Sequence, residues 1–125
     1  MSISNYLEEK ILNKIFSDTN FTVSTVYISL HTGDPGETGA SEATGGSYIR
    51  QLASFDAASN PAGTVQNSAI IDFTSMPSTT ITHIGMWDDE SAGNFLWGGS
   101  FTASKVVNSG DTYRIPAAAL TVTLS

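Results

Sequence analysis

The sequence predicts a mainly β fold: an antiparallel β-sandwich, of the jelly-roll or immunoglobulin-like kind, with one N-terminal α-helix. Three observations predict it: a helical repeat of apolar residues confined to the N-terminus, apolar–polar alternation in short segments after residue 20, and turn residues between those segments. The strand–helix–strand alternation of a nucleotide-binding fold is not found. The 125 residues suit one domain, residues 1–125.

The helix is predicted over residues 1–17, with Ser4 or Asn5 as its N-cap. Its apolar stripe repeats every four residues and consists of Ile3, Leu7, Ile11 and Ile15. At about 100° per residue, Leu12 and Phe16 fall to one side of this stripe. Two interpretations stay open: these two side chains pack under a neighbouring loop, or they contact another copy of the protein.

Seven or eight short strands are expected after the helix. In the first of them, Val26, Ile28 and Leu30 alternate with Tyr, Ser and His, which is typical of a strand on a half-buried sheet. The segments predicted to form strands are 24–32, 47–55, 68–73, 80–88, 94–101 and 118–125, with two more on either side of a turn within 105–115.

Turn-forming residues mark the connections between these strands. Segment 33–46 is rich in Gly, Ser, Thr, Glu and Ala and has no large apolar side chain, so it is predicted to be a long exposed loop. Asn60, Pro61 and Gly63 predict a turn. Pro77 predicts a break or an edge strand.

Alternation within 80–88 assigns its side chains to two faces. Ile84 and Met86 share one face, and Ile81, His83 and Trp87 share the other. The aromatic rings around this segment, Trp87, Phe95, Trp97 and Phe101, are interpreted as core. The alternative is an outer-face platform for stacking sugars or for a subunit contact.

The acidic segment 88–94, DDESAGN, is predicted to be the tip of a β-hairpin. Gly93 and Asn94 tolerate the positive φ that a chain reversal needs. A cation site and a catalytic site are the weaker alternatives. The segment lacks the alternating oxygens, central glycine and distal glutamate of a calcium loop, and His83 lies five residues before Asp88, which is no established ligand spacing.

The charge balance excludes several classes of partner. Twelve acidic residues against five basic ones give a net charge of −7, whereas binding to nucleic acid or to an anionic membrane needs a basic face. The chain has no cysteine, so it has no disulfide and no thiolate zinc site. Neither a signal peptide nor an apolar run of about 20 residues is seen. These features favour synthesis in the cytoplasm.

No residue pattern points to catalysis, a cofactor, a metal ion or a small-molecule substrate. The two histidines have no cysteine to join them as ligands, and Gly45–Gly46–Ser47 lacks the closing glycine of a nucleophile elbow. A hydrolase with a carboxylate pair, drawn from residues such as Asp88, Asp89 and Glu90, stays open as a rival. The chain is expected not to be an enzyme.

Five short motifs follow one another in a familiar order. They are Ser-Asn-Tyr-Leu-Glu at 4–8, Thr-x-Asp-Pro at 32–35, Tyr-x-Arg-Gln at 48–51, His-x-Gly-x-x-Asp at 83–88 and Gly-Asp-Thr at 110–112. In this order the chain resembles a family of small tailed-bacteriophage virion proteins, commonly labelled tail fibre or minor tail proteins. The likeness covers nearly the whole length, and its motifs are structural rather than chemical.

The resemblance implies a non-enzymatic virion structural protein, either a tail fibre or minor tail component or a capsid-decorating protein. Such a protein is made in the host cytoplasm, acts by protein–protein assembly with other virion proteins, and forms a homo-oligomer, here expected to be a trimer. The expected assembly surfaces are Leu12, Phe16 and Trp87, with the loop 33–46. The alternative is a host-surface or glycan-binding module that uses exposed Trp87 or Trp97.

Overall fold

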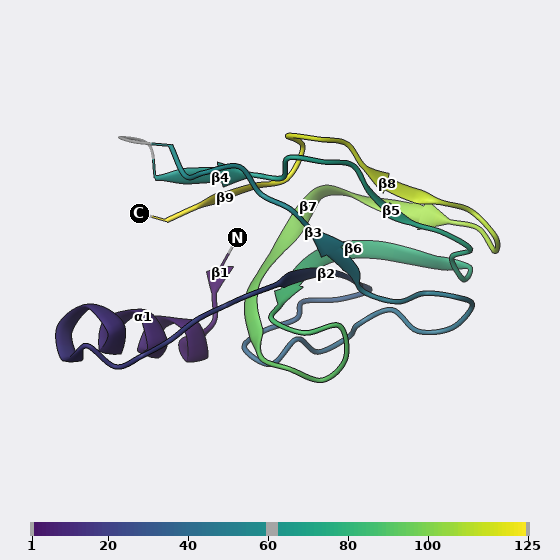
Figure 1. The fold of residues 1–125 in the computed structure, drawn as a ribbon. Coiled ribbons are helices and arrows are strands. Elements are labelled where there is room, and N and C mark those ends of the chain that lie inside the picture. The colour runs from purple at the N-terminus through teal and green to yellow at the C-terminus, as the bar shows by residue number, and fades with distance from the viewer. Residues whose placement is uncertain (1, 60–62, 125) are drawn as a thin grey trace.

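The computed structural model describes residues 2–59 and 63–124. Within them the elements are β1 Ser2–Ile3, α1 Asn5–Ser17, β2 Val26–His31, β3 Gln51–Ala53, β4 Thr64–Gln66, β5 Ile71–Phe73, β6 Thr79–Trp87, β7 Phe95–Val107, β8 Tyr113–Ile115 and β9 Thr121–Thr123. One layer is a five-stranded antiparallel sheet of order β1-β7-β6-β2-β3, and the other consists of the ladders β4–β9 and β5–β8 (Figure 1). The predicted mainly β sandwich with one N-terminal helix is confirmed.

The helix begins at Asn5 rather than at residue 1, because β1 pairs with β7 before the helix starts. Ser4, one of the two predicted caps, is the N-cap. Its Oγ accepts a hydrogen bond from the Leu7 backbone N–H at 3.2 Å and donates to the carbonyl of Phe95 at 2.7 Å. The cap therefore also fixes the start of the helix to the sheet. No helix of the described residues is long and apolar enough to cross a membrane.

The first three residues of the predicted four-residue apolar stripe pack in or against the core, and the last does not. Leu7 belongs to the core, and Ile3 and Ile11 pack against it, but Ile15 is 65% exposed. The last turn of α1 projects beyond the five-stranded sheet (Figure 1). The stripe is thus longer than the surface that covers it.

The sequence predicted that the loop 33–46 is exposed, but the structure buries part of it. Its backbone follows β2: the Ala43 N–H donates to the Leu30 carbonyl at 2.8 Å, and Pro35, Gly39 and Ala43 are buried. Small side chains let the loop approach the sheet closely. As a result both faces of β2 are buried, including the polar side of that strand.

The predicted hairpin at 88–94 is confirmed, since β6 and β7 pair on either side of it with Trp87 opposite Phe95. The prediction that Ile81 and Ile84 lie on opposite faces is wrong. A register shift between Ile81 and His83 turns Ile81 toward Ile84, and both are buried in one core. β7 is also longer than predicted, because residues 105–107 continue it.

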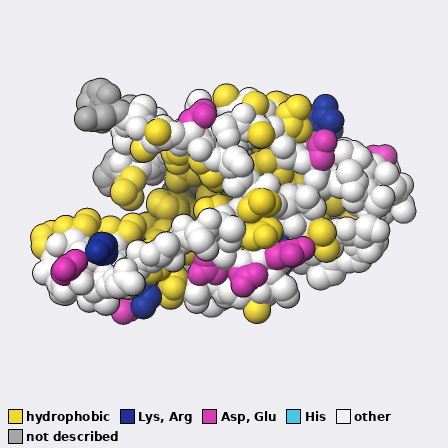
Figure 2. Space-filling view, viewed as in Figure 1, with side chains coloured by type: hydrophobic (Ala, Val, Ile, Leu, Met, Phe, Trp, Pro, Cys, Tyr) yellow, Lys and Arg dark blue, Asp and Glu magenta, His cyan; other side chains and the backbone are white. Residues whose placement is uncertain are grey.

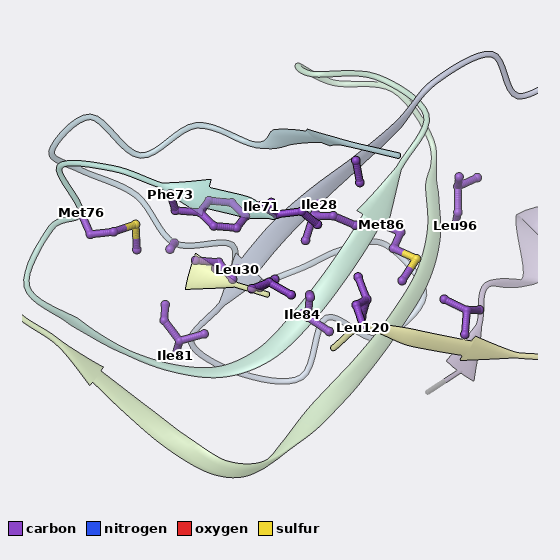
Figure 3. Close-up of a cluster of buried hydrophobic side chains, with 14 of the residues drawn as sticks. Ile28, Leu30, Ile71, Phe73, Met76, Ile81, Ile84, Met86, Leu96 and Leu120 are labelled. Carbon is purple, nitrogen blue, oxygen red and sulfur yellow. The ribbon is translucent and has the colours of Figure 1, made fainter. Parts of the chain in front are cut away.

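The core lies between the two layers. Phe73 and Ile71 of β5, with Leu120, face Ile28 and Leu30 of the large sheet. Figure 3 shows this cluster with Ile28, Leu30, Ile71, Phe73, Met76, Ile81, Ile84, Met86, Leu96 and Leu120 labelled. The strand predicted over 47–55 is regular only in β3, and the short strands β1 and β4 were not predicted.

The turn predicted at Asn60 and Pro61 lies outside the described residues. On either side of it, Ser59 N–H donates to the Thr64 carbonyl at 2.8 Å and Gly63 has φ 64°. These contacts lead the chain into β4.

Two neighbouring isoleucines test the core assignment. Ile71→Ala, at a residue 3% exposed, is expected to lower the free energy of unfolding by about 3 kcal/mol, because it leaves a cavity between the layers. Ile70→Ala, at a residue 53% exposed, is the control and is expected to change it by less than about 0.5 kcal/mol. Urea unfolding of both variants measures the difference. Equal losses would contradict the assignment.

Candidate functional site

Arg50 is the centre of a polar cluster beside the β6–β7 hairpin. Its guanidinium carbon lies 3.6 Å from the centre of the Trp87 ring. Nε and Nη2 donate to the two carboxylate oxygens of Glu42 at 3.0 and 2.9 Å. Nη1 donates to the backbone carbonyls of Asp89 and Ala92 at 3.2 and 2.8 Å. With only 9% of the Arg50 side chain exposed, this bidentate pair is shielded from water.

Tyr48 completes the cluster from two residues before Arg50. Its hydroxyl donates to Glu42 Oε2 at 2.8 Å and accepts from the Leu30 N–H at 3.0 Å. Burial raises the pKa of the Tyr48 phenol well above its usual value, so the hydroxyl stays protonated and remains a donor. The Tyr-x-Arg motif therefore supplies two groups to one carboxylate of the loop.

Trp87 is buried, being only 8% exposed, so the prediction that it lies at an exposed assembly surface is wrong. Loop 33–46 brings Gly39 against the ring, leaving no space for a side chain at that position. Phe95 packs edge-on at 5.2 Å between ring centres. The interpretation of this ring as core is the correct one, and the loop that covers it is the reason.

Ser29 and His31 form a second polar contact under Trp87. His31 Nδ1 lies 2.7 Å from the Ala40 carbonyl, which can only accept, so Nδ1 carries the proton and Nε2 accepts from Ser29 Oγ at 2.7 Å. Ser29 Oγ in turn accepts from the Trp87 indole N–H at 2.9 Å. Both side chains are fully buried, so this serine–histidine pair cannot reach a substrate and holds Trp87 in place.

The neighbouring strand has no room for a side chain at this contact. A Cβ at Gly85 would lie 2.5 Å from Ser29 Oγ and 2.6 Å from His31 Nε2. The glycine of the His-x-Gly motif is therefore required by packing. Burial away from water lowers the pKa of His31, and its hydrogen bond to the Ala40 carbonyl opposes this effect.

One acidic side chain of the hairpin tip, that of Asp88, is hydrogen-bonded within the turn. Asp88 accepts from the Asn94 backbone N–H at 2.6 Å and from Asn94 Nδ2 at 2.9 Å, whereas Asp89 and Glu90 are exposed. In residues 2–59 and 63–124, no three His, Cys, Asp or Glu side chains are grouped so that they could hold a metal ion. The carboxylate of Asp88 acts inside the turn.

A polar hollow of about 420 Å³ lies beside the loop 33–46, with Asp34, Glu37 and His83 in its wall. Both acids are engaged within the chain. Asp34 accepts from the Gly36 N–H at 2.9 Å, and Glu37 accepts from the Asn5 N–H at 2.7 Å, at the start of the helix. These carboxylates therefore order the loop and the helix N-terminus.

Leu12 and Phe16 are exposed, at 55% and 79% of their surface. The interpretation that they pack under a neighbouring loop is therefore wrong. Ile15 lies on the same helix face and is equally unburied, which the four-residue stripe did not indicate. The structure thus presents three large apolar side chains at the free end of α1.

An apolar groove separates α1 from the β4–β9 ladder. It holds about 330 Å³, and every residue of its wall is hydrophobic. Figure 2 shows it as a hollow with hydrophobic side chains in its depth and along the helix edge. The wall includes Leu7 and Ile11 of the helix, Val65 and Val122 of the ladder, and Leu96 and Trp97 of β7.

Sequence reasoning missed the Arg50–Glu42 pair and the groove. An arginine within the apolar alternation of 47–55 is a usable signal, because a half-buried guanidinium needs a partner. Nothing local identifies Glu42 as that partner. The groove joins segments distant in sequence, so no local pattern indicates it.

Comparison with known proteins adds one match. The family model described as podophage GP4 fiber I protein gp80 matches residues 2–123 of the chain. No curated protein matches it. The match includes all the residues of the polar cluster and both sides of the groove.

Replacing Arg50 tests whether its hydrogen bonds hold the hairpin tip in place. Arg50→Met keeps contact with Trp87 but leaves Glu42 half-buried without its partner, so a loss of about 3 kcal/mol in unfolding free energy is expected. Hydrogen exchange of the amides in 88–94 should accelerate, because the two hydrogen bonds from Arg50 Nη1 to backbone carbonyls of this segment are lost. Arg114→Met breaks the exposed pair with Asp72 and is the matched control, expected to change little. Unchanged hydrogen exchange in Arg50→Met would contradict this role of Arg50.

His31 predicts the pH dependence of stability. Its pKa is lowered in the folded protein, so the unfolded chain takes up a proton first, at its ordinary pKa of about 6.5. Stability is therefore full above that pH and falls as the pH drops below it, by at most about 1.4 kcal/mol per pH unit. Unfolding free energies from pH 7.5 to 5 measure the slope. His31→Gln should remove it, whereas His83→Gln, the control, should retain it.

Proposed function

The chain belongs to the family of the podophage GP4 fiber I protein gp80 and is a phage structural protein, and we propose that it is a non-enzymatic component of the tail fibre. In this role it is built into the virion through contacts with other virion proteins. The family match over residues 2–123 carries the proposal. The family description names a fibre, which favours the tail over capsid decoration.

The use of the polar side chains supports a structural role. The groups most suited to chemistry are engaged inside the fold: Arg50 with Glu42, His31 with Ser29, and Asp88 with Asn94. Each stabilises a loop or a turn on the sheet. The resulting molecule has a polar, hydrogen-bonded end around the hairpin and an apolar surface at the end of α1.

The exposed end of α1 supports assembly by protein contact. Leu12, Ile15 and Phe16 are large apolar side chains on one helix face, and such patches mark protein interfaces in soluble proteins. A homo-oligomer, with a trimer as the expected order, and contacts to neighbouring virion proteins both fit this surface. The glycan-binding alternative loses its main argument because Trp87 is buried and Trp97 lies in the wall of the groove.

Particles purified from an infected culture test the proposal. Immunogold labelling of an epitope-tagged chain is expected at the tail, and particles from a phage lacking the gene should have filled heads but incomplete fibres. Labelling on the head surface would replace the fibre role by decoration. Absence of the chain from purified particles would refute a virion role altogether.

A surface variant tests the role of the helix in incorporation. Leu12→Asp is expected to reduce the amount of chain per particle at least tenfold, measured by quantitative mass spectrometry. Leu52→Asp, at an equally exposed leucine of β3, is the matched control and should be incorporated normally. Equal incorporation of both variants would show that α1 is not an assembly surface.

A further inference from the structure

The chain carries both halves of a helix-in-groove contact. One half is the apolar end of α1, and the other is the apolar groove between α1 and the β4–β9 ladder. We propose that the end of α1 in one copy binds in this groove of a second copy of the chain. The proposal rests on the assembly role above and specifies the contact that carries it.

The helix end has the spacing of an anchor segment. Leu12, Ile15 and Phe16 stand at i, i+3 and i+4, which places them on one face of a helix. More than half of each side chain is exposed, and α1 projects beyond the sheet at this end (Figure 1). The three side chains can therefore enter a concave surface without refolding of the chain.

The groove has the size and chemistry to receive them. Its volume of about 330 Å³ suits a few large side chains rather than a whole domain. Val65 and Val122 form one wall, Leu7 and Ile11 the opposite wall, and Trp97 is half-buried beside them. Figure 2 shows that the hollow is open to the surface and continuous with the apolar edge of the helix.

The distribution of charge favours a second copy as the occupant. The chain has a net charge of −7, yet segments 57–71 and 115–125, which include β4 and β9, contain no Asp, Glu, Lys or Arg. Two acidic molecules can meet on this surface without like-charge repulsion, and interface cores are depleted in charge. A basic partner would find no opposite charge on the ladder. The three anchors are uncharged as well.

The apolar area is also of the right order. Leu12, Ile15, Phe16 and Leu124 each expose more than half of their surface, and the half-buried wall of the groove adds to this. Together they offer on the order of 600 Å² of apolar surface, at the upper limit of what a monomer exposes. A standard interface buries about 800 Å² per partner. About 65% of a homodimer interface is apolar, so the apolar part of such an interface, roughly 500 Å² per partner, is within what the helix end and the groove offer together.

Two closed arrangements satisfy this contact. If each helix end enters the groove of the other copy, a dimer closes. If the insertion runs head to tail, a ring closes, and the trimer expected from the sequence is one such ring. Both arrangements use the same residues and leave no groove empty.

The first test is the solution mass of the purified full chain, by light scattering over a concentration series. The wild type should be a dimer or a small ring of the 13.2 kDa chain. Phe16→Asp should weaken association roughly 100-fold or more, since it removes the largest anchor and adds a charge. Val106→Asp, at an exposed valine of β7, is the matched control and should associate as the wild type does. Circular dichroism confirms that each variant is folded.

The second test joins anchor and groove covalently. The chain has no native cysteine, so single-cysteine variants report one contact each. Differently tagged Phe16→Cys and Val65→Cys chains, mixed under oxidising conditions, should form a disulfide-linked heterodimer. The mixture of Val106→Cys and Val65→Cys should not. Cross-linking through Val106, or none between Phe16 and Val65, would overturn the proposal.

The outcomes separate this inference from the proposed function. A monomeric wild type that is nevertheless found in the fibres of purified particles would overturn self-association and leave the virion role intact. Loss of a different virion protein from Phe16→Asp particles, with a monomeric purified chain, would overturn self-association and assign the helix end to that protein instead. An oligomer that Phe16→Asp does not weaken would also overturn the proposed contact.

Discussion

The stacking of Arg50 on Trp87, together with its bidentate pairing with Glu42, is the interaction on which this end of the structure depends. It joins the segment before β3, the loop 33–46 and the hairpin tip through a single side chain. Because Arg50 is almost completely shielded, its removal would leave the half-buried Glu42 carboxylate without its ion-pair partner and would release the carbonyls of Asp89 and Ala92. With Arg50 in place, the loop 33–46 is held over Trp87, and β2 gains a second buried face.

Below this cluster, a chain of neutral hydrogen bonds runs from Trp87 through Ser29 and His31 to the loop backbone. It has the donor and acceptor pattern of a reactive pair but no access to solvent. Burial determines its role. In an open cleft, Ser29 and His31 would form a candidate catalytic pair, whereas here they fix the position of the Trp87 indole. The Tyr-x-Arg and His-x-Gly segments of this chain are thus explained by packing.

The two ends of the molecule differ in physical character. At the hairpin end, the charged groups of Arg50, Glu42 and Asp88 are hydrogen-bonded within the chain and hold the loop and the turn in place. The opposite end has an apolar helix tip, an apolar groove and an uncharged ladder. Apolar surface of this extent is costly in water and is compensated when copies or partners cover it. An acidic protein whose β4–β9 ladder carries no charge is suited to ordered assembly through that surface.

The sequence by itself determined the features that depend on local periodicity. Four-residue spacing gave the helix, alternation gave β2 and the paired strands β6 and β7, and the acidic segment between aromatic strands gave the hairpin tip. Only the tertiary structure decided which faces of the strands and of the helix are covered by other segments. A bulge turned Ile81 into the core, loop 33–46 buried Trp87, and the end of α1 was left without a cover. The physical reason is that periodicity orients a side chain relative to its own strand or helix, whereas burial requires a segment from elsewhere in the chain.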